Sequence, residues 1–584
     1  MAPNFNIAHC PIKTPTVGEN GWQDFNPHTQ LLKKGDRPFG ARAIDCDITI
    51  EHDVEIVVRD GARLYVDVYR PTNASGPVPA ILSYSPFGKK YSGLIFMPKL
   101  PYGVGVTSED VSGLEKFEGI DPARWCARDF AVISVDARGT GSSDGVVHIM
   151  GSQESEDGYD VIEAIAKKEW CNGSVALAGN SHLAIIQWFI AALNPPSLKA
   201  IAPWEGCSDM YREQFVRGGI FDISNFQNII DFNIRGKIGV EDFTEMYRRT
   251  DQGIIDAYWA DKRPDMSKIR VPTYITGSEF SAIHTMGAVR GWMQLGTEDK
   301  WLRWTGVQEW HDLWSIEETN EDLMDFFDHF LKGKENGWKE KTPKVRMSLL
   351  QFGKREPIDM VVPDFPIPDT DHRSLYFGEN GTLSSTAPSN TSIVTYDSEN
   401  KDDKVAFTIK FDKQTRLVGL PKAVVYMSCD DLDDLCVRVR LRKLDANGKV
   451  LRHCTIPFSR VPFTDPDEAI DSTLIIHHGS VGLLRASHRH IDHTKSMHPQ
   501  YPFHPHDRVE KVTPGTVVRL EIGIWAMSVH YDAGESLAVE ISASSGLWPD
   551  LGDESAPFET NKGVHKVHFG GEYPSHVILP FTNL

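Results

Sequence analysis

A buried strand that runs directly into a serine and then into a helix is the feature that most limits how this chain can fold. Residues 175–179 are small and apolar, Ser181 follows Asn180, and a mostly apolar helix is predicted from His182 until Pro195 ends it. This succession is typical of a nucleophile elbow, where a sharp turn presents the serine hydroxyl above the end of a parallel sheet. We therefore interpret Ser181 as a nucleophile rather than as a helix N-cap alone.

The residues on either side of Ser181 fit this interpretation. The strand and helix backbones nearly touch at such a turn, so small side chains must flank the serine, and Gly179 and Ala184 meet this condition. The first N–H groups of the helix would then point at an anion formed beside the serine hydroxyl.

Strand and helix patterns alternate along the chain around this turn. Residues 46–71 alternate apolar and polar positions about a turn at Asp60-Gly61, and further short strands are predicted at 79–86, 130–138, 271–277 and 300–306. Residues 154–169 and 321–333 have helical spacing. This alternation predicts an α/β fold, with a mostly parallel sheet covered by helices on both faces.

Three stretches depart from the α/β pattern. Residues 1–45 lack a sustained period and are predicted to form an N-terminal arm, and residues 205–265 are helical and aromatic, as expected of a cap inserted over an active site. Residues 346–584 contain short alternating strands separated by turn signals, which predict a C-terminal all-β jelly roll. The α/β-hydrolase-like domain then comprises residues 46–204 and 266–345.

A nucleophilic serine needs a base, and the base needs a group that orients it. In this fold the acid and the histidine follow later strands, in the order serine, acid, histidine. Glu279 is the only carboxylate in the loop after strand 271–277, and His311 lies in the loop after strand 300–306. We expect His311 to be the base and Glu279 its partner, with His284 as the alternative base and a merely packed loop histidine as the other interpretation of His311.

Composition excludes several kinds of partner. The formal net charge is −20, which argues against nucleic acid and anionic membranes, because both require concentrated positive charge. No run of about eighteen apolar residues is present, and the first residues do not resemble a secretory leader. The eight cysteines contain no CxxC pair, so free thiols and a cytoplasmic location are expected.

A group of histidines between residues 488 and 506 could suggest a metal site. It contains no pair at helical i, i+4 spacing and lies in a proline-rich connection, so we interpret it as a histidine-rich loop. The glycines of 136–145 lack the arrangement of a phosphate-binding loop and are interpreted as a turn. We therefore expect neither a metal nor a cofactor.

Several segments, taken in chain order, resemble the cocaine-esterase-like and Xaa-Pro dipeptidyl-peptidase-like hydrolases. They are DGARLYVDVYRP, SPFGKK, DARGTGSSDG, EWCNGSVALAGNSH, FFDHFLKGKENGW and LRASHR, and the resemblance extends over residues 46–584. It implies an α/β-hydrolase core, a helical cap, a C-terminal jelly roll and the hydrolysis of carboxylic esters or amide-type acyl groups.

The resemblance also assigns site residues. It places the nucleophile at Ser181 and one oxyanion donor at the N–H of His182, whereas Phe87 stands where relatives have a tyrosine whose hydroxyl is the second donor. Losing such a donor typically costs about 10²–10³ in rate. Tyr84 is the candidate replacement, if its side chain points into the site.

These observations support three hypotheses about function. The first is a serine hydrolase that cleaves an ester or amide-type acyl group of a small molecule through an acyl-enzyme on Ser181. The second is an acyl transferase or cyclase that uses the same fold with an altered triad. The third is a non-catalytic protein that binds a small ligand. The sequence leaves the formation of a homo-oligomer open.

Overall fold

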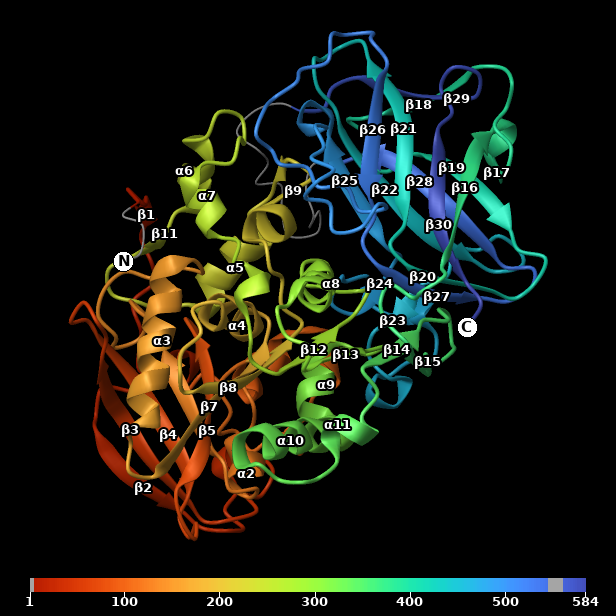
Figure 1. Ribbon diagram of the computed structural model, residues 1–584. Helices are drawn as coiled ribbons and strands as arrows, with labels where there is room; N and C mark the ends of the chain where they lie inside the picture. Colours follow the sequence, from red (N-terminus) through yellow and green to blue (C-terminus); the bar gives the residue numbers. More distant parts are fainter. Residues whose placement is uncertain (1–4, 545–559) are drawn as a thin grey trace.

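The computed structural model describes residues 5–544 and 560–584, which form an α/β layer, a helical cap and a β-sandwich (Figure 1). The α/β layer is built on an eleven-stranded sheet with the order β15-β14-β13-β12-β8-β7-β5-β6-β4-β3-β2. Its central strands run parallel, from β6 to β14, and the outer strands are antiparallel. These strands are β2 (His28–Leu32), β3 (Ile48–Val57), β4 (Arg63–Pro71), β5 (Val78–Ser85), β6 (Ala131–Asp136), β7 (Cys171–Asn180), β8 (Leu198–Trp204), β12 (Thr273–Gly277), β13 (Lys300–Trp304), β14 (Val345–Leu349) and β15 (Ile358–Val362).

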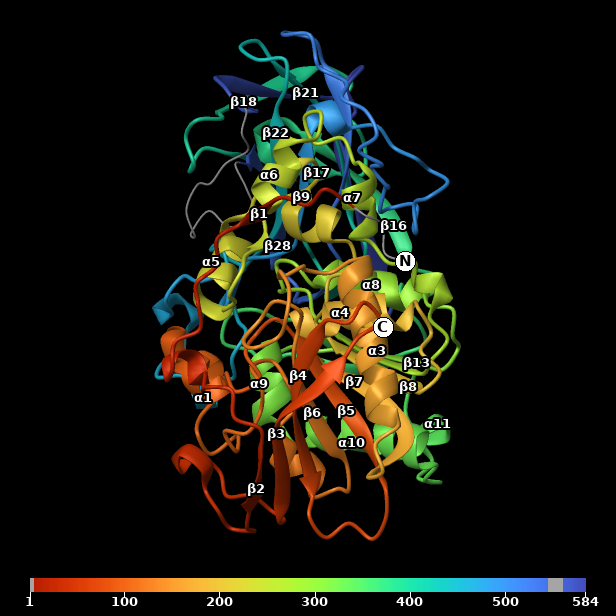
Figure 2. The ribbon, with the colours of Figure 1, turned by 90° about the vertical axis from the view of Figure 1, so that its left-hand side faces the viewer.

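Helices cover both faces of this sheet, as the alternating pattern predicts. On one face α3 (Ser152–Ala166) packs against α4 (His182–Ala191), and Gly158 allows the close approach because a Cβ there would lie 2.2 Å from Ile190 Cδ1. On the other face α2 (Pro122–Cys126) meets α10 (Glu317–Lys332) through the rings of Trp125 and Phe327. Helices α3 and α10 of the two faces can be followed in Figure 2. The predicted α/β-hydrolase architecture is therefore present.

The segment between β8 and β12 forms short helices over the carboxyl ends of the strands (Figure 1). Its helices are α5 (Ser224–Asn233), α6 (Phe243–Arg248) and α7 (Ala257–Asp261). Phe215 stacks on Phe243 with ring centroids 4.3 Å apart, and Trp259 packs beside them. These three aromatic side chains thus form part of the internal core of the segment.

Residues before the sheet pair with both the sheet and the cap. Strand β1 (His9–Cys10) pairs with β11 (Val240–Glu241) of the cap, and β2 adds an edge strand to the large sheet. The N-terminal segment that we expected to be an arm therefore contributes β structure at two places.

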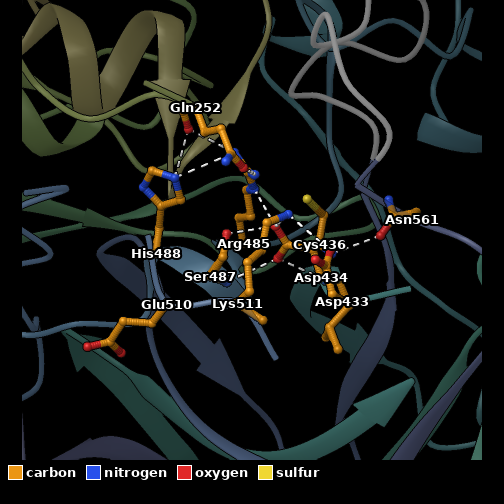
Figure 3. Close-up of polar contacts among 12 residues, drawn as sticks. Gln252, Asp433, Asp434, Cys436, Arg485, Ser487, His488, Glu510, Lys511 and Asn561 are labelled. Carbon is orange, nitrogen blue, oxygen red and sulfur yellow. Dashed lines mark hydrogen bonds and ion pairs between the residues drawn. The ribbon is translucent and has the colours of Figure 1, made fainter. Parts of the chain in front are cut away.

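The C-terminal region is a β-sandwich in which thirteen strands pair into one extended sheet system, from β16 (Asp371–Gly378) to β30 (His576–Thr582). It joins the cap through a buried polar network (Figure 3). Arg485, fully buried, donates from Nε to Asp434 Oδ2 at 2.8 Å and from Nη1 to the carbonyl of Gln252 in the cap at 3.0 Å. Among the described residues, no helix is long and apolar enough to span a membrane.

Candidate active site

Ser181 lies at a strained turn between β7 and α4. Its backbone has φ 53° and ψ −117°, a left-handed conformation that a serine adopts only when its surroundings impose it. Gly179 is needed next to it, because a Cβ at that position would lie 2.6 Å from Leu183 Cβ. The predicted strand, serine and helix are thus arranged as a nucleophile elbow.

His284 is the histidine that the structure brings to Ser181. It follows β12 and immediately precedes α8 (Thr285–Gln294), and its Nε2 lies 3.1 Å from Ser181 Oγ. The ring is buried, with 3% of its surface exposed. Of the two histidines that the sequence left as alternatives, His284 is therefore the one in hydrogen-bonding contact with the nucleophile.

The other nitrogen of His284 has an unusual partner. Its Nδ1 accepts a hydrogen bond from the backbone N–H of Cys207 at 3.0 Å. A backbone N–H can only donate, so Nδ1 carries no proton and the proton of the neutral ring lies on Nε2. Burial lowers the pKa of His284 to about 3, so the ring is neutral at pH 7 and donates Nε2–H to Ser181 Oγ.

The structure does not bring His311 to this site. Its Nδ1 lies 3.0 Å from the carbonyl oxygen of Gly105, to which it donates, and burial lowers its pKa. His311 lies in α9 (Glu309–Ser315), which begins soon after β13, and it is not among the residues that line the cavity with Ser181. In the structure the expected contact between His311 and Ser181 is thus replaced by a bond to Gly105, and His284 takes the place beside the serine.

Glu279 also has a different environment from the one expected. Its carboxylate accepts from the backbone N–H of Ser528, and its Oε1 lies 3.2 Å from His477 Nε2 in the β-sandwich. Burial raises the pKa of Glu279 to about 8. These contacts attach the loop after β12 to the C-terminal region rather than orient either His311 or His284.

The three residues that the sequence suggested for the oxyanion site, His182, Phe87 and Tyr84, have different surroundings. The His182 side chain reaches Glu154, with Nε2 3.2 Å from Oε1, while its backbone N–H begins α4 beside Ser181. Phe87 lines the same cavity as Ser181, with its ring centroid 5.7 Å from that of His182. Tyr84 is buried within β5, near Asp157 and Glu154, and is not among the residues that line the cavity, so its hydroxyl does not replace the missing donor.

Two acidic side chains beside Ser181 were not identified from the sequence. Glu118 and Glu309 line the cavity together with Ser181 and His284. Burial, together with the charge of Glu309, raises the pKa of Glu118 well above its usual value, and burial raises that of Glu309 to about 7. Glu309 lies next to Trp310 and two residues before His311, in the segment where the sequence predicts the base. No local sequence pattern distinguishes Glu118 as a site residue.

The cavity above Ser181 has a volume of about 580 Å³ and is formed by three parts of the chain. Phe87, Phe117 and Ile185 belong to the α/β layer, Phe226 and Ile229 to cap helix α5. Residues 471–474 of the C-terminal region, between β23 (His453–Cys454) and β24 (Ile476–His477), complete the wall. A mostly apolar enclosure with a few polar groups at one end is typical of a small-molecule site.

The histidine-rich loop has partners of its own. His488 Nδ1 lies 3.0 Å from His506 Nδ1, and His488 Nε2 lies 3.0 Å from the carbonyl oxygen of Gln252 (Figure 3). Within residues 5–544 and 560–584, no group of three or more His, Cys, Asp or Glu side chains is arranged to hold a metal ion. These histidines contribute to the contact between sandwich and cap.

A nucleophile elbow at the centre of an α/β sheet, covered by a helical cap and joined to a β-sandwich, defines a serine hydrolase of the α/β-hydrolase fold. Comparison with family models agrees with this class. Residues 60–238 match the X-Pro dipeptidyl-peptidase (S15 family), and residues 336–578 match the X-Pro dipeptidyl-peptidase C-terminal non-catalytic domain.

Individual relatives extend the match over most of the chain. Cocaine esterase from Rhodococcus sp. (strain MB1 Bresler) is 22% identical over an alignment that covers 92% of this chain and 99% of the esterase. A crystal structure of a CocE/NonD family hydrolase from Staphylococcus aureus is 29% identical, with a TM-score of 0.83 and coverage of 97% and 99% of the two chains. An α-amino acid ester hydrolase, at 15% identity and a TM-score of 0.67, shares the fold. The chain belongs to the CocE/NonD family of S15-type serine hydrolases.

Proposed function

We propose that this protein cleaves a carboxylic ester or amide-type acyl group of a small molecule through an acyl-enzyme on Ser181. The observation that supports this most directly is the position of the Ser181 hydroxyl, which hydrogen-bonds to His284 at the polar end of an apolar cavity of about 580 Å³. The relatives, which include an esterase and dipeptidyl-peptidases, point to the same bond types.

The expected chemistry has two halves. In the first, Ser181 Oγ bonds to the acyl carbon, its proton leaves, and the bond from carbon to the leaving oxygen or nitrogen breaks as that atom takes up a proton. In the second, water attacks the acyl-enzyme and the serine is regenerated. The His182 N–H, as the first amide of α4, is the group we propose to stabilise the oxyanion in both halves.

The cavity restricts the substrate that we propose. Its aromatic and aliphatic walls suit an apolar acyl or leaving group, and a volume of about 580 Å³ is within the range of drug-sized ligands.

All eight cysteines are unpaired, which supports the reducing, cytoplasmic location that we propose for the reaction.

Labelling with a fluorophosphonate tests the nucleophile. The wild-type protein is expected to form a covalent adduct on Ser181, and Ser181→Ala is expected to remain unlabelled while keeping the wild-type melting temperature. Turnover of p-nitrophenyl esters with acetyl, butyryl and benzoyl groups then ranks acyl groups by fit to the cavity. An unlabelled wild-type protein would refute the proposal.

One observation favours a second candidate, acyl transfer or cyclisation. The cap helix α5 and residues 471–474 enclose the space above Ser181, and exclusion of water from an acyl-enzyme favours attack by another nucleophile. Mass spectrometry of products formed with an added alcohol or amine separates the two reactions. Transfer products in place of the free acid would support the second candidate.

A further inference from the structure

The directions of the hydrogen bonds around Ser181 show that His284 cannot accept the proton of the serine hydroxyl. Cys207 donates to His284 Nδ1, so His284 donates from Nε2, and Ser181 Oγ is the acceptor of that bond. A histidine that already holds a proton on the nitrogen facing the serine cannot accept another one there. The serine proton must therefore point to a different acceptor.

Glu118 is the acceptor in the right place. Its carboxyl faces the hydroxyl of Ser181 and the backbone N–H of His182, both of which lower its pKa. Oε1 accepts from the indole Nε1–H of Trp310 at 3.2 Å. Oε2 is fully buried and has no hydrogen bond of ordinary length within the described part of the chain, which leaves it available to the reacting groups.

The backbone holds Glu118 in this position. Its carbonyl oxygen accepts from the N–H of Asn180, the residue before the nucleophile, at 2.9 Å. Its own φ is +65°, a left-handed conformation that is uncommon outside glycine and turns the chain sharply just before α2. A residue strained and attached in this way beside a nucleophile is often there for function.

The buried surroundings of Glu118 strengthen its carboxylate as a proton acceptor. Burial is the largest influence on Glu118 and raises its pKa, and the neighbouring Glu309 raises it further. A carboxylate with a raised pKa is a stronger proton acceptor than an exposed glutamate. His284, by contrast, is too weak a base, because burial lowers its pKa to about 3.

We propose that Glu118 is the catalytic base that removes the Ser181 proton, while His284 holds the serine oxygen through Nε2–H; this rests on the serine-hydrolase function proposed above. The O–H bond of Ser181 breaks as Oγ bonds to the acyl carbon, and the proton passes to Glu118. The carbonyl electron pair moves to the oxygen beside the His182 N–H. When the tetrahedral intermediate collapses, the leaving group takes the proton from Glu118. Water then attacks the acyl carbon and gives its proton to Glu118, and the bond from that carbon to Ser181 Oγ breaks as Oγ takes the proton back from Glu118.

Two substitutions distinguish Glu118 from His284 as the base. Glu118→Gln keeps the size of the side chain and its bond from Trp310 but removes the base. His284→Gln keeps an N–H donor close to the position of Nε2 but has no basic nitrogen. The rate of fluorophosphonate labelling and the acylation burst with p-nitrophenyl acetate are measured for both full-length variants.

We expect Glu118→Gln to slow acylation by about 10²–10⁴-fold and His284→Gln by about tenfold or less. A loss of less than a hundredfold in the first variant, or of more than tenfold in the second, overturns the assignment. An unlabelled wild-type protein instead refutes the proposed function itself.

The pH dependence of labelling is a second measurement that does not require Glu118→Gln to fold. Because the ionised form of Glu118 is active, the rate should rise with pH through its raised pKa, both in the wild type and in His284→Gln. Loss of this rise in His284→Gln would overturn the assignment.

Discussion

Removal of the Asp434 carboxylate should destabilise the junction between the cap and the β-sandwich. Asp434 and Arg485 both have 0% of their surface exposed, and Asp434 also accepts from the hydroxyl and the N–H of Ser487 at 2.6 and 3.0 Å. Asp434→Ala leaves a buried guanidinium whose remaining partners include the carbonyl of Gln252 (Figure 3). Breaking such a pair typically costs about 3–5 kcal/mol, and the Gln252 contact places the expected loss at the lower end, about 3 kcal/mol.

Urea unfolding at pH 7, followed by tryptophan fluorescence, measures this loss. The matched control is the adjacent residue Asp433, which is exposed and pairs with Lys511 at 3.0 Å, so that Asp433→Ala should cost about 1 kcal/mol or less. Equal effects of the two substitutions would refute the argument from burial.

The same pair gives a pH dependence with a defined sign. Burial alone would raise the pKa of Asp434, but the charge of Arg485 and the bonds from Ser487 lower it below its usual value. The contribution of a group with a lowered folded pKa is complete above the unfolded pKa, about 3.9 for Asp, and is lost as pH falls through the folded value. The stability difference between wild type and Asp434→Ala should therefore be constant near neutrality and shrink below about pH 4.

Two further substitutions test the site. Phe87→Tyr adds a hydroxyl to a ring that lines the cavity, with its centroid 5.7 Å from that of the His182 ring. This substitution should raise kcat for p-nitrophenyl esters by up to about 10²-fold. An unchanged kcat would show that position 87 does not face the oxyanion. His311→Ala removes the donor to the Gly105 carbonyl and should lower the free energy of unfolding by about 1–3 kcal/mol. The rate at which fluorophosphonate labels Ser181 should stay unchanged. A large fall in that rate would show that His311 acts in the catalytic site.

The fold and the strand–serine–helix turn at Ser181 could be predicted because their signals are local. The periodicity of the strands and helices determines which face each element buries, and the turn is contained within a few consecutive residues, from Gly179 to Ala184. The sequence therefore predicts both the α/β-hydrolase architecture and the sandwich.

The partners of Ser181 could not be predicted in the same way, because they depend on how individual loops turn. The loop after β12 is just long enough for α8 to begin at Thr285, so His284 rather than Glu279 reaches the serine. After β13 the helix begins at Glu309, which directs His311 to Gly105. Glu118 comes from a segment far earlier in the chain, and long-range contacts such as the bond from the Asn180 N–H to its carbonyl place it at the elbow.

The cavity wall supplied by residues 471–474 has a consequence for how this protein can change. These residues lie in the C-terminal region between β23 and β24, a part of the chain that supplies neither Ser181 nor His284, yet they line the space that an acyl group would occupy. Substitutions at these positions can therefore alter which molecules enter the cavity without replacing the groups around Ser181. Part of the selectivity of the cavity is thus encoded far along the chain from its reactive groups.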